Sequence, residues 1–129
     1  MNDADFLRAL ERRELAPAAF THAAHLRAAY LYLRDLGFDA ALPRIRRSIR
    51  EYAAHLGQPD KYHETITVAY LALIQQRLLE RGDGGGWAGF ERLNADLFRR
   101  DLLLRHYRRA ELESPLARRT FVLPSINND

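Results

Sequence analysis

The sequence predicts an all-α protein, and three observations support this class. Alanine, leucine and arginine dominate the composition, and these residues favour helices. Apolar residues recur at spacings of three and four, which is the period of one helix face. Strict alternation of apolar and polar residues, which indicates a half-buried strand, is almost absent. We therefore expect a single domain over residues 1–129, a bundle of five or six helices whose second to fourth members form an up-down core.

Size, charge and cysteine content exclude several classes of protein. A chain of 129 residues can bury a hydrophobic core without a disulfide or a structural metal. The absence of cysteine excludes thiolate metal sites and cysteine nucleophiles. The net charge of +3 is small and its basic residues are dispersed, so we expect no binding to nucleic acid. No apolar run approaches the roughly 18 residues of a membrane span, and the acidic start is unlike a signal peptide, so we expect a cytoplasmic protein without membrane contact.

Capping residues and helix breakers set the expected helix boundaries. Thr21, Asp39 and Asp60 are the N-cap residues expected for the second, third and fourth helices. Gly37 and Gly57 are expected to end the second and third helices. The five expected helices run from Asp3 or Asp5 to Leu15, Thr21 to Gly37, Asp39 to Gly57, Lys61 to Arg81 and Trp87 to Arg100.

Other segments are expected to cover or connect these helices. Residues 1–16 form an N-terminal helix or lid. Residues 82–86 form a flexible glycine-rich surface loop, because no strand precedes them and no Gly-Lys-Ser/Thr follows, as a phosphate-binding loop would require. Ser114 and Pro115 indicate the start of a short last helix. Residues 120–129 form an extended tail whose last three residues should fray.

Four of the five histidines are predicted to lie at one pole of the bundle. His22 and His25 are three residues apart on the inward face of one helix, so both imidazoles reach one point. His63 lies in the first turn of the fourth helix, which begins at the same pole in an up-down bundle. His55 lies at the end of the third helix, again at that pole. We expect His106 to be exposed and without a role.

Three uses of this histidine cluster remain open. In the first, His22, His25 and His63 bind zinc, nickel, copper or iron, with Glu64 as a fourth ligand or as the general base. In the second, no metal is bound and a histidine oriented by Glu64 acts as general acid and base. In the third, the histidines are structural and hydrogen-bond to capping groups such as Asp60.

The leading prediction is an enzyme that acts on a small molecule. One form of this prediction has an anionic substrate. Its chemistry would be that of a metal-dependent hydrolase or lyase, or of metal-free acid–base catalysis. The candidate catalytic residues are Glu64, Thr67 and Tyr62. The candidate supporting residues are His55, Asp60 and Tyr52. No organic cofactor is expected. The alternative is a non-catalytic helical protein that binds a ligand or a partner, and an apolar C-terminal segment is compatible with a homodimer.

Three segments of the chain carry a resemblance to known proteins. They are Phe20-Thr-His-Ala-Ala-His-Leu-Arg-Ala-Ala, Tyr62-His-Glu-Thr-Ile-Thr67 and Ala117-Arg-Arg-Thr-Phe-Val-Leu-Pro124. Together they resemble the signature of an uncharacterised family of small bacterial helical proteins, over most of the chain. The resemblance implies a helical fold and marks His22, His25 and the Tyr62–Thr67 segment as signature positions. It implies no particular reaction.

Overall fold

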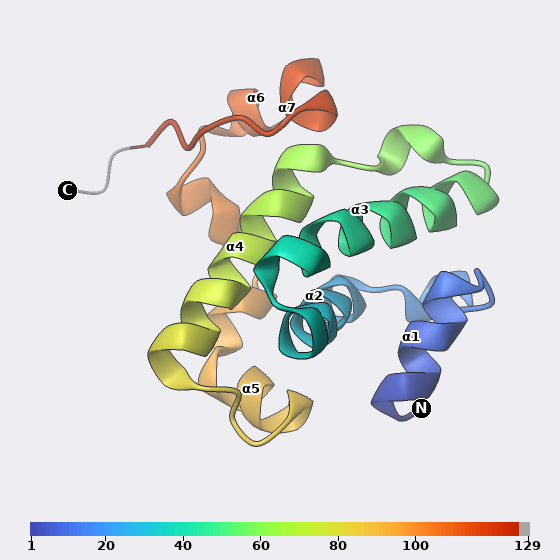
Figure 1. The fold of residues 1–129 in the computed structure, drawn as a ribbon. Coiled ribbons are helices and arrows are strands. Elements are labelled where there is room, and N and C mark those ends of the chain that lie inside the picture. The colour runs from blue at the N-terminus through green and yellow to red at the C-terminus, as the bar shows by residue number, and fades with distance from the viewer. Residues whose placement is uncertain (127–129) are drawn as a thin grey trace. The chain divides into compact units, whose positions relative to one another are not determined.

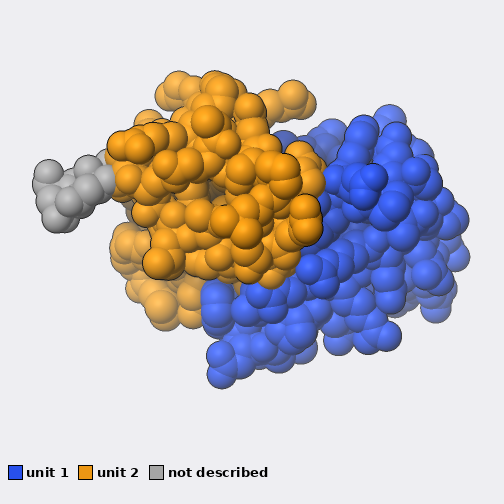
Figure 2. All heavy atoms as spheres, turned by 90° about the horizontal axis from the view of Figure 1, so that it is seen from above, with its two compact units in different colours: residues 1–62 blue, residues 63–129 orange. Residues whose placement is uncertain are grey.

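The computed structural model describes residues 1–126, and all regular structure in this range is helical (Figure 1). This confirms the all-α class. The described residues form seven α-helices and four short 3₁₀ helices, more than the five or six helices expected. The chain divides into two compact units, which Figure 2 colours separately, with the boundary between Tyr62 and His63. The fraying expected for residues 127–129 concerns a segment outside the described residues.

The first unit contains three α-helices and two 3₁₀ helices. In chain order they are α1 (Asp3–Glu11), η1 (Pro17–Ala19), α2 (His22–Leu36), α3 (Phe38–His55) and η2 (Pro59–Lys61). The longest two, α2 and α3, pack against each other, and α1 and η2 both pack against α3. Gly37 joins α2 directly to α3 with a φ of 76°, a conformation that glycine adopts without the strain of a side chain.

Apolar and tyrosine side chains fill the interior of the first unit. Leu10, Leu26 and Ile45 are almost fully buried and come from α1, α2 and α3. The Tyr52 hydroxyl of α3 donates a hydrogen bond of 2.6 Å to the Leu15 carbonyl, which ties α3 to the segment after α1. Leu15 itself lies outside α1, because that helix ends at Glu11 rather than at the expected Leu15.

The second unit contains one long helix and a series of short ones. They are α4 (Glu64–Arg81), α5 (Trp87–Leu93), η3 (Ala95–Phe98), η4 (Leu102–Arg105), α6 (Arg109–Leu112) and α7 (Pro115–Arg119). Helix α4 packs against α7, and η3 packs against η4. Ser114 caps α7 by accepting a hydrogen bond from the Ala117 amide, with Pro115 in its first turn, as the sequence predicts.

Residues 120–126, after α7, form neither helix nor strand and are fastened to the rest of the second unit. The Thr65 hydroxyl donates to the Thr120 carbonyl at 2.8 Å and accepts from the Val122 amide at 3.1 Å. The Tyr107 hydroxyl donates to the Val122 carbonyl at 2.7 Å. The Ile126 amide reaches the backbone carbonyl of residue 106. We refer to residues 120–126 as the C-terminal strap.

The predicted start of the fourth helix at Asp60 is wrong. Asp60 lies in η2, and α4 begins at Glu64 with His63 as its N-cap. Pro59 favours a separate turn, after which Tyr62 is extended with φ −63° and ψ 136°. The predicted cap at Asp39 is also wrong, because Gly37 already begins the third helix and places Asp39 in its first turn.

The single helix expected from Trp87 to Arg100 is interrupted at Asn94. Its backbone there has φ −130° and ψ 44°, so α5 ends and a 3₁₀ helix follows. The buried Asn94 side chain donates to the Phe90 carbonyl and accepts from Arg77 and Arg81 of α4. A side chain used in this way competes with helix continuation, which explains the break. Among the helices of residues 1–126, none is long and apolar enough to cross a lipid bilayer.

Candidate functional site

A cavity of about 420 Å³ in the first unit contains three of the residues singled out in the sequence, His25, Tyr52 and Tyr62. Its volume lies within the range of small-molecule sites. Its walls come from the segment before α2, the first turn of α2, the second half of α3 and the chain through η2. The lining residues are Pro17, Phe20, His25, Ile49, Tyr52, Ala53, Leu56, Gln58, Lys61 and Tyr62. We call this cavity the His25 pocket.

The imidazole of His25 is held in one orientation. Thr21 caps α2 through its side chain, and its backbone carbonyl lies 2.9 Å from Nδ1 of His25. A carbonyl only accepts hydrogen bonds, so Nδ1 carries the proton and donates it. In the neutral ring Nε2 then keeps its lone pair.

The environment of His25 favours this neutral form. Burial lowers the pKa of His25 below its ordinary value of 6.5, against the opposing effect of the hydrogen bond to Thr21. The charge of neighbouring His22, three residues earlier on α2, lowers it further. At neutral pH His25 is therefore an uncharged base with Nε2 as its acceptor atom.

Aromatic rings support His25 from one side. The Phe20 ring stacks on the imidazole, with a centroid distance of 3.9 Å and an interplanar angle of 23°. Tyr52 meets Phe20 edge-on at 4.7 Å, and burial raises the pKa of the Tyr52 hydroxyl. Because that hydroxyl donates to the Leu15 carbonyl, it positions the wall of the pocket. These three rings form a packed aromatic face.

Lys61 and Arg50 give the region its positive charge. Lys61 lines the pocket from η2, and its side chain is exposed. The Arg50 guanidinium lies over the Tyr62 ring, 4.6 Å from the centroid, in cation–π geometry. Sequence reasoning did not select Lys61, although it is the only lysine in an arginine-rich chain. The presence of a single lysine was the sequence feature that could have pointed to this position.

Three other predicted residues of the first unit lie outside the lining of the His25 pocket. His22 is half-buried in the first turn of α2, beside His25. His55 is the last residue of α3 and is exposed. Asp60 is exposed in η2. These three residues are not in the lining of the His25 pocket.

His63 belongs to the second unit and holds backbone segments together. Its Nδ1 accepts a hydrogen bond of 3.2 Å from the Ile66 amide, which caps α4. Its Nε2 lies 2.7 Å from the Leu112 carbonyl and must therefore donate. Burial lowers the pKa of His63, and the charge of Arg118 adds to that effect. Both ring nitrogens of His63 are thus used in structural hydrogen bonds.

Glu64 and Thr67 follow His63 in the first turns of α4. The Thr67 hydroxyl donates to the His63 carbonyl at 2.8 Å, so it serves the start of the helix. Glu64 is buried in the first turn, where the helix dipole stabilises a negative charge. His63, Glu64 and Thr67 therefore occupy one helix start in the second unit.

The predicted metal triad combines residues of both units, His22 and His25 from the first and His63 from the second. Within residues 1–126, no group of three or more histidine, aspartate and glutamate side chains is arranged to hold a metal ion. Metal binding by these three histidines stays a prediction. It would require His63 to give up one of its two backbone hydrogen bonds.

Comparison with known proteins does not identify the function of this site. No family model, no curated protein and no solved structure matches the chain.

Proposed function

We propose that the protein is a small-molecule enzyme in which His25 is the general base and Lys61 binds an anionic group of the substrate. The observation that carries this proposal is the presence, in one pocket, of a neutral imidazole oriented by a backbone carbonyl and of an ammonium group. A general base needs a lone pair at the operating pH and a fixed direction. The hydrogen bond to Thr21 supplies the direction, and burial supplies the neutral state.

The pocket favours an organic anion with an apolar body. Most of its lining is aromatic or aliphatic, with Lys61 as its only charged member. An apolar ring or chain would contact Ile49 and Tyr52, while a carboxylate would pair with the Lys61 ammonium. The reaction class that fits one base and one cation is hydrolysis. Nε2 of His25 takes a proton from water while the water oxygen bonds to a carbonyl carbon and the carbonyl electron pair moves to its oxygen. When the C=O bond re-forms, the bond to the leaving group breaks, and the leaving group departs with its electron pair. The proton on Nε2 then passes to the leaving group or to solvent, which restores the neutral base.

The second unit supplies no reacting group in this proposal. His63 and Thr67 hold the start of α4 through the hydrogen bonds described above. The proposal therefore takes the metal-free version of the predicted acid–base chemistry. The predicted cytoplasmic location is kept as part of the same proposal.

A direct test uses nitrophenyl esters that carry a carboxylate on their acyl chain. We expect release of nitrophenolate above the background rate, with an acid limb in the pH profile set by the lowered pKa of His25. His25→Phe keeps a flat ring to stack on Phe20 but has no nitrogen, so its rate should fall by about 10²-fold or more. Lys61→Met should raise KM more than it lowers kcat.

The matched control is His55→Phe, the same substitution at an exposed position outside the pocket. It should leave the rate within twofold of wild type. If no ester is turned over, binding of benzoate and the three hydroxybenzoates, measured by calorimetry, decides between the enzyme and the non-catalytic alternative. Binding that His25→Phe weakens would favour a ligand-binding protein. Absence of both turnover and binding contradicts a functional His25 pocket.

A further inference from the structure

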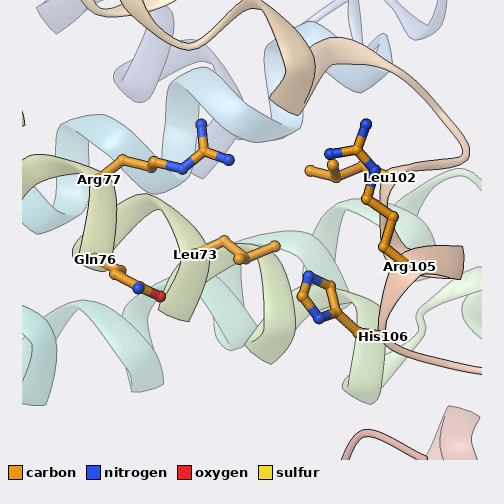
Figure 3. A pocket seen from close by; sticks show the side chains of 6 residues that line it. All are labelled: Leu73, Gln76, Arg77, Leu102, Arg105 and His106. Atoms are coloured by element: carbon orange, nitrogen blue, oxygen red, sulfur yellow. The ribbon is translucent and has the colours of Figure 1, made fainter. Parts of the chain in front are cut away.

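A second cavity, of about 480 Å³, lies in the second unit and shares no residue with the His25 pocket. Leu73, Gln76 and Arg77 line it from α4, and Leu102, Arg105 and His106 line it from η4 and the residue after it. Figure 3 shows the Leu73 and Arg77 side chains extending toward Leu102 and His106 across this space. We call it the Arg77 pocket. Within the described part of the chain, no carboxylate side chain lines it.

Arg77 is fixed in place before any ligand binds. Its Nη1 and Nη2 groups donate to the two carboxylate oxygens of Asp96 at 2.8 and 2.7 Å. Nη1 also donates to the buried Asn94 side chain at 3.2 Å. The Arg77 guanidinium lowers the pKa of Asp96 to about 2, so the pair stays ionised at neutral pH. Such a two-point contact aligns the guanidinium plane.

The remaining lining combines positive charge, further donors and an apolar floor. Arg105 brings a second guanidinium to the lining, beside that of Arg77, which is paired with Asp96. A guanidinium has five N–H donors, so it can serve several acceptors at once. His106 adds an imidazole and is half-buried rather than exposed as the sequence predicted. Its backbone carbonyl is held by the C-terminal strap through the Ile126 amide. Leu73 and Leu102 offer apolar surface between these polar groups.

We propose that the Arg77 pocket binds a small organic molecule through an oxyanion group, a carboxylate or a phosphate. A planar guanidinium pairs with two oxygens of either group. The cavity is several times larger than an inorganic anion needs, and its leucine floor suits the carbon skeleton of an organic ligand. The Gln76 amide nitrogen donates to Glu80 at 2.7 Å, which leaves the Gln76 carbonyl oxygen as an acceptor for a donor of the ligand.

Nuclear magnetic resonance with isotope-labelled full-length protein tests this proposal. Benzoate and phenyl phosphate are the two oxyanion probes, and benzamide is the neutral probe of the same size as benzoate. We expect saturable shifts of the His106 imidazole signals with at least one oxyanion and none with benzamide. A response to phenyl phosphate alone would assign the group as phosphate, and a response to benzoate alone would assign it as carboxylate.

Two arginine variants separate a specific site from general attraction of anions. Arg105→Gln removes one positive charge from the pocket and should weaken binding at least fivefold. Arg100→Gln removes one charge from an exposed position of the same unit outside the pocket and should change affinity less than twofold. Equal effects of the two variants would overturn the proposal, as would shifts with benzamide or the absence of shifts with both oxyanions. The signals of His25 report the other pocket, so the two proposals fail independently.

Discussion

His25 and His63 show how one residue type takes two roles through its ring nitrogens. In His25, Nδ1 donates to a carbonyl, and Nε2 is the acceptor. In His63, Nδ1 accepts from an amide, and Nε2 donates. Burial lowers the pKa of both residues. The neutral forms are therefore opposite tautomers, and His25 lines a pocket.

Protonation of His63 should destabilise the protein in mild acid. Its folded pKa lies below the unfolded value of 6.5, so the unfolded chain binds more protons between these two values. The His63 contribution to stability is thus fully present above pH 6.5 and is lost as the pH falls through 6.5 toward the folded pKa. A proton on Nδ1 would also face the Ile66 amide and the positive end of α4.

Asparagine at position 63 tests this origin of acid sensitivity. His63→Asn retains a good N-cap but does not titrate, and it loses the bond to the Leu112 carbonyl. We expect about 1 kcal/mol lower free energy of unfolding at pH 7.5, and a smaller further loss at pH 5.5 than in wild type. Urea denaturation at both pH values measures this. The control, His55→Asn at an exposed position, should keep the full acid-dependent loss, and equal losses in both variants would contradict the prediction.

At the residue scale, the sequence predicted His25, Tyr52 and Tyr62 as candidate residues, and the structure places all three in the lining of one pocket. Helical spacing placed His22 and His25 on one face, which the structure shows as the first turn of α2. The stacking of Phe20 and the contribution of Lys61 depend on the loops before α2 and after α3. Loop paths are not encoded by a helical period, so spacing alone could not reveal these partners.

Two of the three segments singled out in the sequence contact each other in the second unit. Thr65, from the Tyr62–Thr67 segment, bonds to the backbone at residues 120 and 122. Those residues belong to the third segment, Ala117 to Pro124. The Thr65 hydroxyl therefore fastens the C-terminal strap to α4.

Removal of this hydroxyl should release the strap. Thr65→Val keeps the shape of the side chain but loses both hydrogen bonds and leaves the Val122 amide without its partner. We expect a loss of about 1–3 kcal/mol in the free energy of unfolding and faster hydrogen exchange at the Val122 amide. Thr67→Val, two residues on, is the matched control, because the Thr67 hydroxyl bonds within α4 only. Unchanged exchange at Val122 in the Thr65 variant would refute the fastening role.

Helix boundaries were predictable where standard caps act. Thr21 and Ser114 begin their helices as expected, because each hydroxyl accepts from an amide three residues on. Asp60 has the right chemistry but sits in the turn that Pro59 starts. Histidine is not a common cap, so His63 could not be selected by capping preference. The break at Asn94 depends on Arg77 and Arg81, distant in sequence, and no local signal predicts it.

Loss of the Asn94 side chain should therefore lower the stability of the protein. Asn94→Ala removes the bond to the Phe90 carbonyl and leaves Arg77 and Arg81 without one acceptor each. Because Asn94 is fully buried, we expect a loss of about 1–3 kcal/mol, measured by urea denaturation. Asn2→Ala is an exposed comparison that removes only an end cap of α1 and should cost less. A larger cost at Asn2 would contradict this ranking.

At the scale of the molecule, the sequence predicted an all-helical protein correctly. Composition and apolar spacing suffice for that class because each α-helix of the described residues contributes buried residues. The expectation of one histidine pole required an up-down order for the second to fourth helices. The structure assigns the first three α-helices to one compact unit and α4 to the other, so the histidine pole stays a prediction. Short connections alone do not determine how a chain divides into units.

The proposed mechanism uses no metal, and chelation tests that choice. Treatment with an excess of EDTA followed by dialysis should change neither the ester hydrolysis rate nor hydroxybenzoate binding by more than about twofold. Elemental analysis of untagged protein before and after treatment establishes that any metal was removed. Loss of activity that zinc, nickel, copper or iron restores, and that His22→Ala and His63→Ala abolish, would favour the metal triad over the metal-free account.

The central claim is that His25, which lines its pocket, has an unprotonated Nε2 at neutral pH. Nitrogen-15 resonances of the imidazole measure this directly, because they distinguish protonated from unprotonated ring nitrogens. The account predicts a protonated Nδ1, an unprotonated Nε2 at pH 7, and a titration midpoint below 6.5 that His22→Ala raises. A cationic ring at pH 7, or the proton on Nε2 instead of Nδ1, would contradict the account.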